Sequence, residues 1–229
     1  MRGHMLAIDT ATSQATLAIG DAAGIRLDGR DWPAGHSHAE TLLPILRDLL
    51  AGMGLTPRDL AGVIVGTGPG GFTGLRVGLA TAKTLAHGLG IPIFGVGTAE
   101  ALAAAALGTS TRAAVVVMPA GPADCYLVEA PGPPRLIAPA DRATAIAEAV
   151  AGGAILVVVD LDHDDLPEAA LELGRQALAG LGAALLAAGA RALAAGRADD
   201  PATLVPTYVS LPRGVAAAGG EVAWSPDLR

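Results

Sequence analysis

Apolar residues along the chain form two kinds of run: short continuous or alternating runs that are typical of strands, and longer runs with the spacing of one helix face. Three strand-like runs come first, separated by short turn signals, and they predict an antiparallel meander. Helical and strand-like runs then alternate. In the first half we expect strands at 5–9, 14–21, 24–32, 60–68 and 91–96, and helices at 36–54, 73–86 and 98–107.

A linker at 108–112 precedes a second, shorter series of the same kind. We expect strands at 113–118, 124–130 and 154–160, a helix at 140–153 and an alanine-rich helical region at 166–196. This repeated order is typical of the two-lobed α/β fold of actin-like and sugar-kinase-like ATPases, here with a shortened second lobe. A shared fold by itself implies no activity. The expected units are an N-terminal domain at 5–107, a C-terminal domain at 112–212 and a tail at 213–229.

Composition and charge narrow the class of protein. The chain has 229 residues, of which 52% are hydrophobic, and its formal net charge is -7. An acidic chain binds nucleic acid poorly on its own, because Lys and Arg supply most of that affinity. The single cysteine, Cys125, excludes an internal disulfide and fits a reducing compartment. We find no uninterrupted apolar run of the roughly 20 residues that a membrane span needs, and we expect a cytoplasmic protein.

A glycine-rich loop lies between a strand and a helix in the sequence VGTGPGGFTGLRVGLATAKTLAHG, residues 65–88. Three of its glycines fit the G-x-G-x-x-G pattern of dinucleotide sites. However, no Asp or Glu occurs between Asp59 and Glu100 to hold a ribose, and no glycine precedes Lys83 as a Walker loop requires. The loop therefore predicts a tight turn and not a nucleotide cradle.

Small residues recur every four positions in and around the helix that follows this loop: Gly74, Gly78, Ala82 and Ala86. Such a strip lets another backbone approach closely, although each glycine costs about 0.5–1 kcal/mol of helix stability relative to alanine. The cationic residues of the helix share a different face: Arg76, Lys83 and His87. Two interpretations are open, an ordinary buried helix with a solvated basic face, or a helix built for contact with a partner.

Several segments together resemble one protein family. LAIDTATSQATLAI, HSHAETLLPILRDLL, GTGPGGFTGLRVGLATAKTLA and IPIFGVGTAEAL, with PTYVS near the C-terminus, resemble the bacterial tRNA threonylcarbamoyladenosine biosynthesis proteins TsaB, also called YeaZ. The likeness is strong over about residues 5–106. It implies a non-catalytic scaffold or activator, a paralogue of TsaD, the enzyme that transfers threonylcarbamoyl to N6 of the adenosine beside the anticodon in tRNA.

The resemblance also implies partners. The chain would bind a TsaD-like catalytic paralogue, work with a TsaE-like ATPase and reach tRNA mainly through the partner. ATP and metal are expected on the partner subunits, and no cofactor on this chain. The same helices, 39–50 and 73–86, would also support a competing homodimer. The implied partner-binding residues are Leu42, Leu43, Leu46, Gly70, Phe72, Thr73, Gly74, Arg76, Gly78, Leu79 and Lys83.

The metal histidines of the catalytic paralogue are missing from this chain. The resemblance places its H-x-x-x-H motif at Thr98 and Leu102, and neither side chain can replace imidazole as a ligand. We therefore predict no catalytic residue and no metal site. Two further departures from the family pattern, at Pro119–Tyr126 and at Ser210, affect the wall of the cleft in the second lobe and leave the N-terminal helices untouched.

A vestigial nucleotide site is the remaining candidate. Asp9, Thr10 and Thr12 occupy the place where active relatives of this fold orient Mg²⁺ and phosphates, although a polar turn between strands uses the same residue types. The second phosphate loop is expected at 157–165, where four aspartates would repel phosphate unless a metal intervened. We favour an acidic solvated turn before a helix over a cation site as the explanation of these aspartates. We predict weak or no ATP hydrolysis. The alternative hypothesis is an independent small-molecule kinase or hydrolase of the same superfamily.

Overall fold

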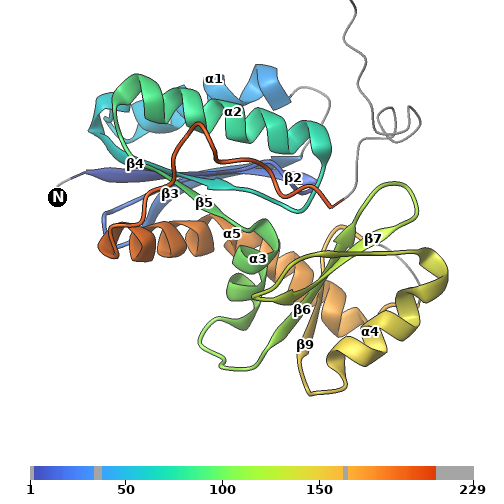
Figure 1. The fold of residues 1–229 in the computed structure, drawn as a ribbon. Helices are drawn as coiled ribbons and strands as arrows, with labels where there is room; N and C mark the ends of the chain where they lie inside the picture. The colour runs from blue at the N-terminus through green and yellow to red at the C-terminus, as the bar shows by residue number, and fades with distance from the viewer. Residues whose placement is uncertain (1–2, 34–37, 162–164, 210–229) are drawn as a thin grey trace, which may run out of the picture.

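The computed structural model describes residues 3–33, 38–161 and 165–209, which form two β-sheets (Figure 1). The first sheet has five strands in the order β3-β2-β1-β4-β5. β1 pairs antiparallel with β2 and parallel with β4, and β2 pairs antiparallel with β3, so the predicted meander is confirmed. The strands are β1 His4–Asp9, β2 Gln14–Gly20, β3 Arg26–Pro33, β4 Leu60–Gly66 and β5 Ile93–Val96.

The second sheet repeats this order with one strand fewer, β8-β7-β6-β9. β6 takes the place of β1, because it pairs antiparallel with β7 and parallel with β9. The repeat confirms the expected two-lobed α/β fold with a shortened second lobe. β8 was not predicted, because three residues after two prolines carry too short a pattern. The strands are β6 Ala114–Pro119, β7 Cys125–Ala130, β8 Arg135–Ile137 and β9 Ile155–Val158.

Helices cover both faces of the first sheet, with α1 and α2 on one side and α5 on the other (Figure 1). Leu17 of β2 belongs to the apolar cluster under α1 and α2, and its neighbour Ala18 belongs to the cluster under α5. Alternate residues of one strand thus feed two cores. The helices are α1 His38–Gly52, α2 Phe72–Leu89, α3 Thr98–Leu107, α4 Arg142–Val150 and α5 Glu168–Ala194, with short 3₁₀ helices η1 Pro57–Asp59 and η2 Pro139–Asp141.

The helix α5 links the two lobes. Gly174 lies against the carbonyl oxygen of Val158 in the second lobe, and Gly189 lies against Ile64 in the first. By length and composition alone α5 could cross a membrane, with a mean hydropathy of 1.6, which corrects the expectation that no such run exists. The helix nevertheless belongs to the protein core, because three of its leucines are fully buried: Leu181, Leu185 and Leu186.

Residues 199–209, here called the C-terminal segment, run along the β5 edge of the first sheet (Figure 1). Asp199 forms an antiparallel bridge with Ile93. Further on, the N–H of Thr207 donates a 2.8 Å hydrogen bond to the carbonyl of Thr67. The segment therefore covers a strand edge that would otherwise be open to pairing. The chain after α5 returns to the first lobe, although the sequence analysis assigned it to the second.

Candidate functional site

Asp9 is the last residue of β1, and its side chain is completely buried at the carboxyl end of the first sheet. One carboxylate oxygen accepts a 2.8 Å hydrogen bond from the N–H of Ala11, and the other accepts a 2.7 Å bond from the hydroxyl of Thr98. That hydroxyl in turn accepts a 3.0 Å bond from the N–H of Gly68. Gly66 has to be a glycine here, because a Cβ would overlap the Asp9 carboxylate.

Burial raises the pKa of Asp9 from 3.8 to about 6. The hydrogen bonds from Ala11 and Thr98 oppose this rise, because they stabilise the ionised form, and the nearby charge of Asp160 adds to it. A carboxylate perturbed in this way is a general candidate for acid–base work. Here, however, both oxygens face donors of the same chain.

The two threonines of the expected nucleotide site lie beside Asp9, as predicted, and both are nearly buried. Thr10 donates a 2.7 Å hydrogen bond to the carbonyl of Gly74 in α2, and Thr12 donates a 2.8 Å bond to the carbonyl of Gln14. These contacts fasten the β1–β2 turn to α2 and to itself. The hydroxyl groups are therefore committed within the chain.

Ser13, which the sequence analysis did not single out, joins the two lobes. Its N–H donates a 2.6 Å hydrogen bond to Asp160, and its hydroxyl donates to the other oxygen of the same carboxylate. Asp160 has a φ of 58°, which is uncommon for a residue with a side chain. No pattern links two residues 147 positions apart, so this contact emerges only in the folded structure.

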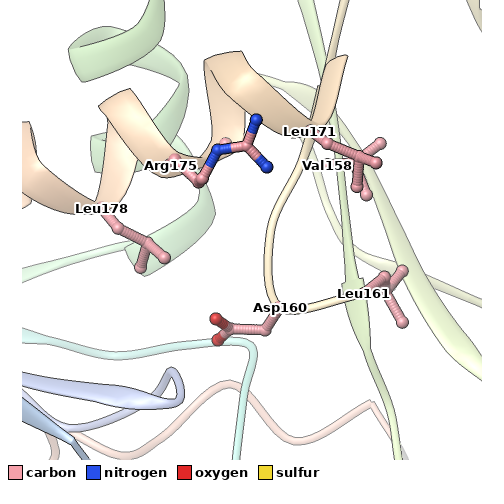
Figure 2. Close-up of a pocket in the computed structure, with 7 residues that line it drawn as sticks. Val158, Asp160, Leu161, Leu171, Arg175 and Leu178 are labelled. Atoms are coloured by element: carbon pink, nitrogen blue, oxygen red, sulfur yellow. The ribbon is translucent and has the colours of Figure 1, made fainter. Parts of the chain in front are cut away.

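A cavity of about 240 Å³ opens beside Asp160, with α5 on one side and the loop after β9 on the other (Figure 2). Its two charged residues are already engaged within the chain. Arg175 pairs with Glu168 and Glu172 of its own helix, and Asp160 accepts from Ser13. The remaining lining is apolar or small: Val158, Leu161, Leu171, Gly174 and Leu178.

The acidic segment after β9 supplies no metal site in the part of the chain that the structure describes, where no three His, Cys, Asp or Glu side chains gather as ligands. Asp165 pairs at 2.9 Å with Arg142 of α4. Asp162 and Asp164 lie outside the described residues. The second phosphate loop was expected in this segment, and the repeat shows that this place is wrong. β9 is the counterpart of β4, and the counterpart of the β1–β2 turn is the β6–β7 turn.

The departure from the family pattern at Pro119–Tyr126 falls in this β6–β7 turn. The turn is closed by a 3.0 Å hydrogen bond from the N–H of Ala120 to the carbonyl of Asp124. Cys125 lies on β7 as a small buried residue, and burial raises the pKa of its thiol. The second departure, Ser210, lies outside the described residues.

The positions that the resemblance assigns to metal histidines in the catalytic paralogue are closed. Thr98 and Leu102 are both fully buried. Thr98 holds the Asp9 carboxylate, and Leu102 belongs to the apolar core between the lobes. Neither residue lines the cavity beside Asp160, the one between β5 and α5, or the one between α1 and α2.

Part of the predicted partner surface is buried inside this chain. A Cβ at Gly74 would overlap the carbonyl oxygen of Thr10, one at Gly78 would overlap the Thr10 hydroxyl, and Gly70 stands in the same relation to Ala11. The glycine strip thus packs on the β1–β2 turn of its own chain, which corrects the expectation that a partner backbone fills it. Three predicted leucines lie in the core beneath α1 and α2: Leu42, Leu46 and Leu79.

The other predicted residues lie at the surface of α1 and α2, exposed or half-buried: Leu43, Phe72, Thr73, Arg76 and Lys83. Leu43 is 52% exposed and borders a mostly apolar cavity of about 280 Å³ between α1, η1 and α2. Arg76, Lys83 and His87 lie on the outer side of α2, as their spacing predicted. A residue that the sequence analysis missed, Tyr208 of the C-terminal segment, accepts a 3.1 Å hydrogen bond from Arg76 Nε.

Comparisons with known proteins agree with this architecture. The family model described as TsaD, tRNA N6-adenosine threonylcarbamoyltransferase, matches residues 33–195. An uncharacterized protein of Mycobacterium tuberculosis is 36% identical over 210 residues, which cover 91% of this chain and 92% of that protein. The structure of YeaZ from Pseudomonas aeruginosa has a TM-score of 0.62 at 25% identity and covers 90% of this chain and 100% of that one.

Relatives with a named role match less than half of this chain. The Escherichia coli tRNA threonylcarbamoyladenosine biosynthesis protein TsaB is 34% identical over 100 residues, which are 44% of this chain and 42% of that protein. The Bacillus subtilis TsaB is 43% identical over 68 residues, 30% of each chain. The family model, at residues 33–195, spans parts of both lobes. The chain therefore belongs to the TsaD-type family, and within that family it is a homologue of the TsaB (YeaZ) proteins.

Proposed function

We propose that the chain is a non-catalytic subunit of the machinery that forms threonylcarbamoyladenosine in tRNA, and that it acts by binding a TsaD-like catalytic paralogue. The observation that carries this proposal is a closed internal contact where the resemblance places a metal centre in the paralogue. Thr98 holds Asp9, and Leu102 fills the neighbouring core. A cytoplasmic location follows from a role in tRNA modification.

ATP and metal, in this proposal, are held by the partner subunits, the TsaD-like paralogue and a TsaE-like ATPase. The polar groups of the candidate nucleotide site, Asp9, Thr10 and Thr12, already have partners in this chain. A phosphate would have to displace these contacts and would meet the charge of Asp160 as well. Robust Mg²⁺-dependent ATP turnover by the purified chain would contradict this part of the proposal and favour an independent kinase or hydrolase.

The outer side of α1 and α2 is the surface best suited to the paralogue. An exposed large apolar residue, Leu43, borders an apolar cavity there, and such patches commonly serve protein contacts. The same surface would bring two copies of this chain together, so a homodimer would compete with the heterodimer. With a net charge of -7, the chain is expected to contact tRNA mainly through its partner.

A reconstituted transfer assay tests the role. Unmodified tRNA, the threonylcarbamoyl-adenylate donor, the TsaD-like paralogue and the TsaE-like ATPase from the same source are combined with and without this chain, and modified adenosine is counted. We expect modification to fall strongly when the chain is left out and to recover when it is added back. Equal modification in both reactions would overturn the proposed function.

A charge placed on the exposed leucine tests the surface. We expect Leu43→Asp to weaken binding to the paralogue by about tenfold or more, because a carboxylate would have to be desolvated in an apolar contact. Leu136→Asp is the matched control, since Leu136 is 43% exposed on β8 of the second lobe. Equal affinity for both variants would remove α1 from the proposed interface.

A further inference from the structure

Three side chains from two distant parts of the chain form one cluster at the start of α2. The guanidinium carbon of Arg76 lies 3.8 Å from the ring centre of Phe72 and 6.0 Å from that of Tyr208. Arg76 Nε donates a 3.1 Å hydrogen bond to the Tyr208 hydroxyl. The two rings lie 5.4 Å apart. A cation near two ring faces and fixed by a hydrogen bond is ordered more tightly than a surface arginine usually is.

The position of Tyr208 is set by the first sheet and not by α2. The neighbouring Thr207 is hydrogen-bonded to Thr67 at the end of β4, and Asp199 is bridged to β5. Between them, Leu204 packs against the core beneath α1 and α2. The C-terminal segment therefore brings a phenol to a fixed place beside Arg76.

These contacts use Nε and the faces of the guanidinium, and within residues 3–33, 38–161 and 165–209 its two terminal nitrogens have no hydrogen-bond partner. Among the residues that the structure describes, Arg76 forms no ion pair. Both Arg76 and Tyr208 are exposed, and Lys83 lies on the same side of α2. The outer edge of the guanidinium is thus presented to solvent in one orientation.

We propose that Tyr208 is a positioning residue, and that it holds Arg76 ready to pair with a carboxylate of the TsaD-like partner through its two terminal nitrogens. The inference rests on the proposed function. A planar guanidinium matches a carboxylate with two parallel hydrogen bonds. An arginine already fixed by Phe72 and Tyr208 loses less side-chain entropy when that pair forms.

A protein carboxylate fits this surface better than a nucleic-acid phosphate does. The guanidinium of Arg76 lies over two aromatic rings, and exposed Leu43 lies on the neighbouring helix. Aromatic residues and arginine with apolar neighbours are typical of protein interfaces. The net charge of the chain is -7, which disfavours long-range attraction of RNA. Charge complementarity therefore points to an acidic side chain on the partner protein.

The test measures the affinity of the purified paralogue for full-length variants at about 50 mM and about 300 mM NaCl. We expect Arg76→Gln to weaken binding about tenfold to a hundredfold, and Tyr208→Phe, which keeps the ring and removes the hydroxyl, about threefold to tenfold. The double variant should bind no more weakly than Arg76→Gln, because Tyr208 acts through Arg76. Added salt should weaken the wild type more than Arg76→Gln.

Arg191→Gln is the matched control, because Arg191 is an exposed arginine of α5, on the opposite face of the first sheet. We expect this variant to bind the paralogue like the wild type, and all variants to unfold at unchanged temperatures. If the wild type does not bind the paralogue, the proposed function fails and this inference with it. If the wild type binds the paralogue and both variants, Arg76→Gln and Tyr208→Phe, bind it as tightly as the wild type does, the inference alone is overturned. If Arg76→Gln weakens only the binding of tRNA to the assembled complex, Arg76 pairs with a phosphate of the tRNA, and the proposed pairing with a carboxylate of the partner protein is wrong.

Discussion

The hydroxyl of Thr98 donates a 2.7 Å hydrogen bond to the carboxylate of Asp9, across 89 positions of sequence. The same hydroxyl accepts a hydrogen bond from the N–H of Gly68 in the glycine loop. Thr98 is the first residue of α3, so the start of this helix, the end of β1 and the glycine loop meet at one buried point. Two hydrogen bonds of Thr98 therefore help to fix the shape of the glycine loop.

Replacing Thr98 with valine tests this point. The substitution keeps the shape of the side chain and removes the partner of two buried groups, Asp9 Oδ2 and the Gly68 N–H, while Asp9 Oδ1 keeps its bond from Ala11. We expect the free energy of unfolding to fall by about 1–3 kcal/mol, and to fall more at pH 8 than at pH 5, because the ionised carboxylate needs the bond most. Chemical denaturation at both pH values measures the loss. Thr84→Val, at an exposed position of α2, is the control and should leave stability nearly unchanged.

The raised pKa of Asp9 predicts a pH dependence of stability. Burial raises this pKa from 3.8 to about 6, so the folded state binds a proton more tightly than the unfolded state does. The stability due to this group is fully present below about pH 4 and is lost as the pH rises to about 6, by up to about 3 kcal/mol. Asp9→Asn removes the titration. Between pH 4 and pH 7 the free energy of unfolding should therefore fall less for the variant than for the wild type. The same fall in both proteins would show that Asp9 keeps its ordinary pKa.

The order of strands and helices could be predicted from sequence because each lobe has strong local patterns. The alternation in β2 and the helical spacing in α1 are visible in single segments. β8 escaped prediction because Arg135–Ile137 is too short to carry a period. The course of the chain after α5 escaped it for another reason: whether residues 199–209 pair with β5 or with the second lobe depends on tertiary contacts alone.

The candidate site shows the same limit. The clustering of Asp9, Thr10 and Thr12 could be predicted because the three polar residues lie within one short turn of the sequence. The spacing of Gly74 and Gly78 correctly indicated close approach of another backbone, but periodicity on one helix cannot say whether that backbone belongs to the same chain. Residues that meet across lobes, such as Ser13 and Asp160, leave no local signal.

Two glycines of α2 are predicted to respond in opposite ways to the same substitution. Gly74→Ala places a Cβ against the backbone oxygen of Thr10, and we expect a loss of about 1–3 kcal/mol of stability from overpacking. Gly88→Ala, where nothing lies within 4 Å of the added Cβ, should instead gain about 0.5–1 kcal/mol from helix propensity. Thermal unfolding distinguishes the two. A neutral Gly74→Ala would mean that the strip has room for a partner after all, whereas a loss means that bulky variants there test folding and not docking.

The contact between Ser13 and Asp160 predicts a local change in hydrogen exchange. Asp160→Ala removes both acceptors of Ser13 and leaves an alanine at a φ of 58°, which disfavours the closed arrangement of the turn and the loop. We expect the amide of Ser13 to exchange about tenfold to a hundredfold faster, measured by mass spectrometry on peptides that span the β1–β2 turn.

Asp160→Asn separates the lost acceptors from the strained backbone in this experiment. Asparagine tolerates the left-handed conformation and keeps one carbonyl oxygen, so its effect on Ser13 should be smaller than that of alanine. Peptides from β9 report on the second lobe itself and should exchange as in the wild type. Because α5 and the apolar core around Leu102 also connect the lobes, unchanged exchange at Ser13 in Asp160→Ala would mean that these contacts hold the turn in place without the Ser13–Asp160 bonds. Faster exchange confined to the turn would instead show that the Ser13–Asp160 contact holds the β1–β2 turn against the loop after β9.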